Sequence, residues 1–469
     1  MDARGRPDAH EASDAPLRLD PAPEHFLDAG AIAAARREAR AGRRDFIRAA
    51  FAAALAGGSA TKAAAQAPDA ADAPDAAGDP QILLAQPQRH ALGQPVAQDG
   101  YGRPSRYEAN VQRRISPGLT PTRESGVSFT PLQSLFGIVT PSGLHFERHH
   151  AGGWDLDPRR HRLLVHGADA ALVKAPMVFT MDDLMRLPSV SRFHFIECGA
   201  NTGMEWGGVA VPTVQYTHGM LSCSEFTGVP LRLVLERAGA DFRRGRFVLA
   251  EGGDGSALTR TIPMALVESG EVLLAYGQNG EMLRPENGYP LRLVVPGVQG
   301  VSWVKYLRRI EVGDTPFGTK DETLMYVDLM PDGRYRQYTS LQECKSVITT
   351  PSGGQVLRGR GFLQVSGLAW SGRGRVRRVD VTLDGGRNWQ PARLQAPVMS
   401  KCLTRFTLPW VWDGRAALLA SRAIDDTGYV QPGYGALRAV RGTRSPYHNN
   451  AVQSWLVQES GEVANVQLP

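Results

Sequence analysis

The stretch of sequence that decides both fold and chemistry is Arg192-Phe-His-Phe-Ile-Glu-Cys198-Gly-Ala-Asn201-Thr-Gly-Met-Glu-Trp206. Phe193 and Phe195 alternate with His194 and Ile196, which is the period of a β-strand, and the glycines that follow predict a loop. The pattern therefore predicts a strand that ends at Cys198, with the thiol at the strand tip over a pocket. A thiolate in that position suits a soft metal ion. The alternative is a small core residue, because free cysteine is among the most buried residue types.

The composition is that of a globular protein with real cores. The chain has 469 residues, of which 42% are apolar and 21% charged, enough for two or three domains. Its 51 glycines and 32 prolines indicate a loop-rich, strand-dominated body, so we expect an α+β protein. The net charge of +6 is mild and the arginines are scattered, which argues against nucleic acid and favours an anionic small molecule or an acidic partner.

The four cysteines, at positions 198, 223, 344 and 402, are too few for a disulfide scaffold. They form neither a C-x-x-C pair nor a C-x-x-C-H haem attachment, so any electron-carrying haem must belong to another chain. For Cys223, Cys344 and Cys402 a disulfide and buried free thiols both stay open, and the sequence does not say which pair would be bridged.

The N-terminal segment has the parts of a twin-arginine export signal. Arg43-Arg44 is followed by a short alanine-rich core over residues 50–60 and by a small-residue cleavage site at Ala65-Gln-Ala67. The core is too short and too weakly apolar to span a membrane. This route exports folded proteins, so it favours a cofactor inserted before export and a periplasmic location. About 40 residues precede Arg43, and we expect translation to start nearer to it.

Changes in composition and in the pattern of apolar residues divide the rest of the chain into three regions. Residues 68–129 are Pro/Ala-rich and predict a linker or arm. Residues 130–345 predict a mixed catalytic domain, and residues 346–469, with alternating strands and tight turns, predict a β-sandwich. In the catalytic domain we expect a helix over residues 231–238 and strands at the short apolar runs 163–165, 193–196, 247–250, 272–275 and 291–295.

Two further segments carry candidate ligands. In the run from Ser142 to Gly153, Arg148, His149 and His150 lie among glycines in a predicted loop, with a spacing that matches no zinc motif. Flat bidentate donors beside accessible backbone suit a phosphate or a pterin, although a solvated basic loop is the alternative. The run from Glu286 to Lys305 predicts a buried strand between turns, with Arg292 and Lys305 as inward cations or, alternatively, as surface charges.

Together these segments resemble the sulfite oxidase family of molybdenum enzymes. The resemblance spans about Thr130 to the C-terminus and rests on Cys198-Gly-Ala-Asn201, the Arg148-His149-His150 segment, Gly288-Tyr-Pro-Leu-Arg292 and residues 300–309 and 379–389. Within the family it is strongest for the molybdenum subunits, called SoxC, of sulfane dehydrogenases in thiosulfate oxidation, through residues 217–220, 275–280, 342–349 and 447–450. It implies a mixed α/β molybdopterin domain followed by an immunoglobulin-like β-sandwich dimerisation domain.

The resemblance also implies roles for single residues. Cys198 would be the one protein ligand of molybdenum, in a molybdopterin cofactor (Moco). Tyr326, placed only by its distance from Lys305, would be an active-site tyrosine, and Arg441 an anion-binding arginine from the second domain. Asn287 replaces a histidine common in the family. The remaining residues expected to line the pterin and substrate pocket are Phe146, Glu147, Arg148, His149, His150, Asp254, Arg292, Trp303, Val304 and Lys305.

One departure from the family pattern bears on the substrate. In sulfite oxidases the segment that ends in Asn201 here continues with arginines that help to hold sulfite, whereas this chain continues with Thr202-Gly203-Met204. Free sulfite would lose charge-assisted hydrogen bonds at such a site, each worth roughly 1.5–3 kcal/mol. The resemblance therefore implies oxo transfer to sulfane sulfur held as a cysteine persulfide on a carrier protein.

The partners follow from the same resemblance. It implies that electrons pass to a c-type haem cytochrome subunit, and that the second domain forms a homodimer, which gives a heterotetramer. We expect neither nucleic acid nor a membrane span. The alternatives are a sulfite dehydrogenase that passes electrons to cytochrome c, and a non-catalytic scaffold for a cytochrome partner, in which the metal-ligand cysteine would be lost.

Overall fold

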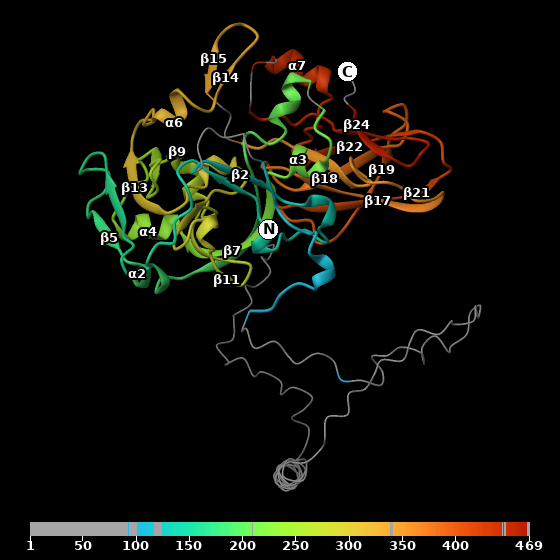
Figure 1. Cartoon of the computed structure of the whole chain (residues 1–469). Helices are drawn as coiled ribbons and strands as arrows, with labels where there is room; N and C mark the ends of the chain where they lie inside the picture. The colour runs from blue at the N-terminus through green and yellow to red at the C-terminus, as the bar shows by residue number, and fades with distance from the viewer. Residues whose placement is uncertain are drawn as a thin grey trace, which may run out of the picture. The chain divides into compact units, whose positions relative to one another are not determined.

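The computed structural model describes Leu92 and residues 101–116, 124–208, 210–337, 341–442, 444 and 447–466 (Figure 1). The predicted export signal, residues 1–67, lies outside the described residues, as does most of the predicted arm. Of that arm, Leu92 and residues 101–116 and 124–129 are described, and the strand over residues 126–129 lies in a sheet. Within these ranges no helix is long and apolar enough to cross a membrane.

The first part of the described chain is built on two five-stranded sheets and a small three-stranded one. In the sheet that carries the cysteine segment, the strands run in the order β11-β10-β7-β6 and β12 also pairs with β10; the other five-stranded sheet has the order β5-β4-β13-β8-β9. Strands β4 and β13 are parallel, and the other pairs in these sheets are antiparallel. The strands are β1 (Arg114–Ile115), β2 (Gly126–Phe129), β3 (Glu147–His149), β4 (Leu163–Gly167), β5 (Met177–Phe179), β6 (Val190–Glu197), β7 (Leu221–Pro230), β8 (Phe247–Gly252), β9 (Thr259–Pro263), β10 (Leu273–Gln278), β11 (Glu281–Met282), β12 (Arg292–Val294) and β13 (Leu307–Gly313).

The helices within the described residues are short. In α4 the buried residues Leu231, Val234 and Leu235 have the spacing of one helix face, and that face joins the core. The α-helices are α2 (Met181–Met185), α3 (Val214–His218), α4 (Leu231–Arg237), α5 (Met264–Glu268), α6 (Lys320–Thr323) and α7 (Tyr434–Arg441). The 3₁₀ helices are η4 (Arg106–Glu108), η5 (Leu132–Ser134), η6 (Ser142–Leu144), η7 (Gly203–Gly207), η8 (Pro285–Asn287) and η9 (Gly300–Ser302).

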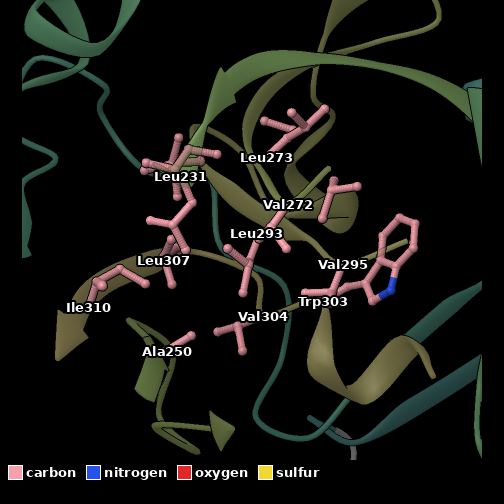
Figure 2. Close-up of a cluster of buried hydrophobic side chains, with 14 of the residues drawn as sticks. Leu231, Ala250, Val272, Leu273, Leu293, Val295, Trp303, Val304, Leu307 and Ile310 are labelled. Atoms are coloured by element: carbon pink, nitrogen blue, oxygen red, sulfur yellow. The ribbon is translucent and has the colours of Figure 1, made fainter. Parts of the chain in front are cut away.

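The core of this part joins both five-stranded sheets. Leu273 of β10 and Leu293 of β12 belong to the same buried cluster as Ala250 of β8 and Ile310 of β13, and Leu231 of α4 lies beside them (Figure 2). The segment over residues 291–307 contributes many of these side chains, so it is anchored in the core. The polar residues of that segment are therefore held in fixed positions. The prediction of one strand with both cations is wrong, because Arg292 begins β12 whereas Lys305 lies between η9 and β13.

The second part of the described chain is a β-sandwich. One sheet has the order β16-β17-β21-β20 and the other β19-β18-β22-β23-β24, and Val347 and Phe406 of the first share a core with Leu419 and Trp455 of the second. The strands are β16 (Lys345–Thr350), β17 (Gly361–Trp370), β18 (Val376–Thr382), β19 (Gln390–Pro391), β20 (Arg393–Leu394), β21 (Thr404–Trp412), β22 (Ala417–Asp425), β23 (Ser454–Val457) and β24 (Val463–Val466), and the hairpin β14 (Val327–Leu329) and β15 (Tyr335–Gln337) precedes them. The predicted α+β class with a sandwich is confirmed.

Three of the four cysteines are buried and none is in a disulfide. The Sγ atoms of Cys223, in β7, and Cys402, just before β21, lie 3.4 Å apart. The proximity of Cys402 and the burial of both residues raise the pKa of the Cys223 thiol, and burial raises that of Cys344. Cys198 is the fourth cysteine and is partly exposed.

Candidate active site

Cys198 follows the last residue of β6 directly and begins a tight turn. Its backbone N–H donates to Met220 O at 3.0 Å, and its carbonyl accepts from Asn201 N at 3.0 Å. A side chain at Gly199 would displace the buried side chain of Gln299, because a Cβ there would lie 2.0 Å from Gln299 Oε1. The thiol is thus fixed at a strand tip, as predicted, and it lines a pocket. Burial raises the pKa of the Cys198 thiol.

The pocket beside Cys198 has an empty volume of about 730 Å³, part of which is open to solvent. Eleven of the residues predicted to line it besides Cys198 do so, and they come from β3, the loop after β8, η8, β12, the end of η9 and the α6–β14 connection. They are Phe146, Glu147, Arg148, His149, His150, Asp254, Asn287, Arg292, Trp303, Lys305 and Tyr326.

Two predicted residues lie elsewhere. Val304 is buried in the core and its side chain does not line the pocket. Arg441, the last residue of α7, is also buried, and its Nη2 pairs with Glu343 Oε2 at 3.2 Å. Glu343 and Cys198 both line a small cavity of about 190 Å³. Arg441 therefore reaches the surroundings of Cys198 only through its partner Glu343. The segment with Arg148, predicted as a loop, is strand β3.

Besides Arg148, two cations line the pocket: Arg292, which is buried, and Lys305, which is partly buried. Arg292 donates from Nη1 to Asn287 O at 3.0 Å and from Nη2 to Trp303 O at 3.2 Å, and burial lowers its pKa to about 10. Lys305 Nζ lies 3.1 Å from His149 Nδ1 and donates to Glu286 O at 3.1 Å. Burial, and then the nearby Arg292, lower the pKa of Lys305 to about 7.

The three histidines of the segment are neutral at pH 7. Burial lowers the pKa of His145 to about 3, and it lowers those of His149 and His150 to about 4, with help from Lys305 and Arg148 respectively. Neutral imidazole both donates and accepts hydrogen bonds. His149 and His150 therefore add polar contacts to the pocket without adding charge.

Tyr326 is brought into the pocket by contacts from distant parts of the chain. Its hydroxyl oxygen lies 3.2 Å from His150 Nε2, its ring lies 4.9 Å from the ring of Tyr447, and Arg260 lies 5.4 Å from its ring centre. Burial raises the pKa of Tyr326, so its hydroxyl stays protonated. The phenol is thus a hydrogen-bond donor close to Cys198.

The residues present fit an anionic pterin. Among the described residues, His145 Nε2, Asn287 Oδ1 and Arg292 Nε are buried and have no hydrogen-bond partner within the protein. All three residues line the pocket, and buried polar atoms are nearly always paired, so a polar ligand bound there would satisfy them. Arg292 and Lys305 supply positive charge for a phosphate, and the Cys198 thiolate would hold a soft metal.

A second cavity, with an empty volume of about 950 Å³, lies on Cys198 and Arg148 as well. Its other residues are uncharged except Glu205, whose pKa burial raises to about 7. Met204, half exposed, is one of them. The cavity is lined by Val127, Phe129, Arg148, Cys198, Ala200, Thr202, Gly203, Met204, Glu205, Val211, Tyr216, Thr217 and Met220.

Several site residues were missed. His145 and Glu286 line the pocket and stand next to predicted residues in the sequence, so their neighbours were the available signal. Tyr447 lies against Tyr326 with the two rings tilted by 31°, and it lies in a segment that carried the resemblance, but no local pattern marked its side chain. Arg113 forms an ion pair with Glu147, and no sequence pattern around Arg113 indicated a place near the site.

Lys305 should make anion binding to the cofactor-free protein depend on pH. Between pH 6 and 8 Lys305 loses its charge, while Arg292 stays charged and His149 and His150 stay neutral. We expect the affinity for sulfate, whose charge is constant in this range, to fall as pH rises, by up to about tenfold per pH unit above 7. Calorimetry measures this affinity, and Lys305→Met should remove its pH dependence. An unchanged dependence in that variant would assign the titration to another group.

Comparison with known proteins agrees with this geometry. Residues 150–320 match the family model of the oxidoreductase molybdopterin binding domain, and residues 336–455 match that of the Mo-co oxidoreductase dimerisation domain. Sulfite oxidase from Gallus gallus is 32% identical over 390 residues, which cover 76% of this chain and 82% of that protein. Mitochondrial sulfite oxidase from Mus musculus is 32% identical over 320 residues, which cover 63% of this chain and 58% of that protein. The chain thus spans less than two thirds of the mouse enzyme.

Among solved structures, the sulfane dehydrogenase SoxCD from Paracoccus pantotrophus is similar to this chain. The identity is 47% and the TM-score 0.80, over 83% of this chain and 99% of that one. The pocket with its single thiol, its cations and its unpaired polar atoms therefore lies in a fold with molybdopterin-binding relatives. The chain belongs to the sulfite oxidase family of molybdenum oxidoreductases.

Proposed function

We propose that this chain is the molybdenum subunit of a periplasmic sulfane dehydrogenase, which oxidises sulfane sulfur held as a cysteine persulfide on a carrier protein. The observation that carries the proposal is the cavity beside Cys198. At Thr202, Gly203 and Met204, where sulfite oxidases have arginines by the family pattern, this cavity is uncharged and large. Its single cation, Arg148, suits a substrate with little charge of its own. The 47% identity to the SoxCD chain supports the same substrate class.

The cofactor would supply the oxo transfer and two-electron redox chemistry when bound. Cys198 would be its protein ligand, and Arg292, Lys305, Asn287 and His145 would hold the pterin and its phosphate. Arg148 lies on both cavities and would stabilise negative charge that develops on the substrate oxygen. Tyr326 would donate a hydrogen bond from its protonated hydroxyl. We keep Arg441 as an indirect contributor, through Glu343.

The assembly is part of the proposal. Residues 130–345 would form the catalytic domain and residues 346–469 the dimerisation domain of a homodimer, as the matched dimerisation family suggests. Electrons would pass to a c-type haem cytochrome subunit, giving a heterotetramer. Residues 1–67 would direct twin-arginine export and residues 68–129 would form an arm.

The experiment that tests the proposal combines metal analysis with two substrates. Protein purified with its native partners is assayed for molybdenum and for cytochrome c reduction, first with free sulfite and then with carrier-bound sulfane sulfur. One molybdenum per chain and turnover on the bound sulfur alone are expected. Turnover on free sulfite would instead favour a sulfite dehydrogenase, to which the 32% identity with sulfite oxidases points. A chain that binds no molybdenum would be a scaffold.

Met204→Arg should shift the enzyme toward free sulfite. Met204 is half exposed in the cavity, so a guanidinium there would add charge-assisted hydrogen bonds to a dianion. We expect the affinity for sulfite, measured by inhibition of turnover on bound sulfur, to rise about tenfold. Met185→Arg is the matched control, because Met185 is equally exposed in α2 and lines neither cavity. Equal sulfite affinity in both variants would contradict our account of this cavity.

A further inference from the structure

Residues near and within the second part of the described chain, the β-sandwich, form hydrogen bonds to the turn that carries Cys198. This turn, residues 198–202, is called the Cys198 turn below. His448 N donates to Gly199 O at 2.7 Å, and Thr202 Oγ1 donates to Asn449 O at 2.8 Å. From a second segment, Gln342 Nε2 donates to the carbonyl of Glu197 at 3.2 Å. Two separate segments, residues 342–345 and 447–450, therefore form hydrogen bonds to a turn that belongs to the first part of the described chain.

A buried ion pair lies at the centre of this contact. Lys345 Nζ lies 2.9 Å from Glu197 Oε1, and the two side chains are only 3% and 4% exposed. Glu197 Oε1 also accepts from Asn201 Nδ2 at 3.0 Å, and its Oε2 accepts from Trp370 Nε1 at 2.8 Å. The carboxylate that precedes Cys198 is thus satisfied by one group of the turn and by two groups of the sandwich. Removing one partner of such a pair leaves an uncompensated charge.

The same lysine supports a strained residue. Thr202 has a φ of +62°, in the left-handed region that β-branched residues rarely adopt. Such a conformation persists only where the surroundings determine it. Here Lys345 Nζ donates to Thr202 Oγ1 at 3.0 Å while that hydroxyl binds Asn449 O. The path of the turn away from Cys198 therefore depends on contacts from the second part of the described chain.

We propose that Glu197 and Lys345 are positioning residues, and that their ion pair fixes the Cys198 turn. The thiol then points into the pocket of about 730 Å³ beside it, called the cofactor pocket below. Neither residue lines that pocket, so they act through the Cys198 turn. The inference rests on the proposed function only in taking Cys198 as the metal ligand. It assigns part of the active-site geometry to the sandwich domain.

The test uses the reactivity of Cys198 in the cofactor-free protein. Cys198 is partly exposed, whereas Cys223, Cys344 and Cys402 are at most 1% exposed, so the fast phase of alkylation by iodoacetamide reports Cys198. Glu197→Gln keeps the shape of the side chain and removes its charge. We expect the alkylation rate to rise at least tenfold as the turn loosens. In the molybdenum-loaded enzyme we expect a shift of the thiolate-to-metal absorption band and a lower kcat with little change in KM.

Lys345→Met tests the pair from the other side, and Lys401→Met is the matched control. Lys401 also pairs across the two parts of the described chain, with Glu271, but not at the Cys198 turn. We expect Lys345→Met to match Glu197→Gln, and Lys401→Met to lower the unfolding temperature while leaving the alkylation rate and the absorption band at wild-type values. Wild-type alkylation in Glu197→Gln, or an equal rise in Lys401→Met, would overturn the proposal. Because alkylation needs neither cofactor nor substrate, it stays decisive if the proposed activity fails.

Discussion

Cys198→Ser is expected to abolish turnover, by at least about 1,000-fold, while the protein stays folded. Serine keeps the size of the side chain, but its hard, protonated hydroxyl is a poor ligand for a soft metal centre. Cys198 is partly exposed and packs against the edge of the core, and serine is close to it in size, so little packing is lost. Cytochrome c reduction measures the turnover, metal analysis the molybdenum content, and thermal unfolding the stability.

A matched control separates the ligand role from a general need for thiols. Cys402 is buried in the sandwich core, outside the cofactor pocket and outside the segments that hold the Cys198 turn, so Cys402→Ala should cost stability but leave turnover per folded molecule within about twofold. Appreciable turnover in Cys198→Ser would refute the assignment of Cys198 as the metal ligand. Equal losses of turnover in both variants would refute it too.

Arg148→Gln should lower kcat/KM about 100-fold to 1,000-fold. Arg148 is the cation that lines both cavities, and it is held in place by hydrogen bonds from Nη1 to Ser125 Oγ at 3.3 Å and to His149 O. Removing one donor that stabilises developing charge typically has an effect of this size. Steady-state kinetics on carrier-bound sulfur measure it, and we expect most of the loss in kcat.

Two further variants sharpen this result. Arg148→Lys keeps the charge without the planar fork, and we expect an intermediate loss. Arg162→Gln removes an exposed arginine that lines neither cavity and should leave the kinetics unchanged. If Arg148→Gln changed KM alone, Arg148 would bind the substrate without favouring its transition state.

The parts of the site that could be predicted are those with a local signal. The alternation before Cys198 and the glycines after it are readable within a few residues, and the structure places the thiol at the tip of β6 accordingly. The apolar runs likewise became β4, β6, β8, β10 and β12. Short-range periodicity carries such information because each residue's direction is set by its own strand or helix.

The parts that could not be predicted depend on long-range contacts. Tyr326 was placed only by its distance from Lys305, and it reaches the pocket through His150, 176 positions away. Arg441 was expected at the substrate, but Glu343 holds it outside the pocket lining, and no pattern near either residue announces that pair. The pair of Glu197 and Lys345 is separated by 148 positions. Sequence periodicity says nothing about which distant residues meet.

The hydrogen bonds from residues 447–450 to the Cys198 turn also affect the order in which chain synthesis, folding and cofactor binding can occur. Domains emerge from the ribosome and fold from the N-terminal side, so the first sheets exist before the sandwich does. The turn that presents Cys198, however, is complete only once His448 and Asn449 have docked. We therefore expect nascent chains arrested before residue 447 not to bind the cofactor. Cofactor binding would then require that the chain has been synthesised through residue 450.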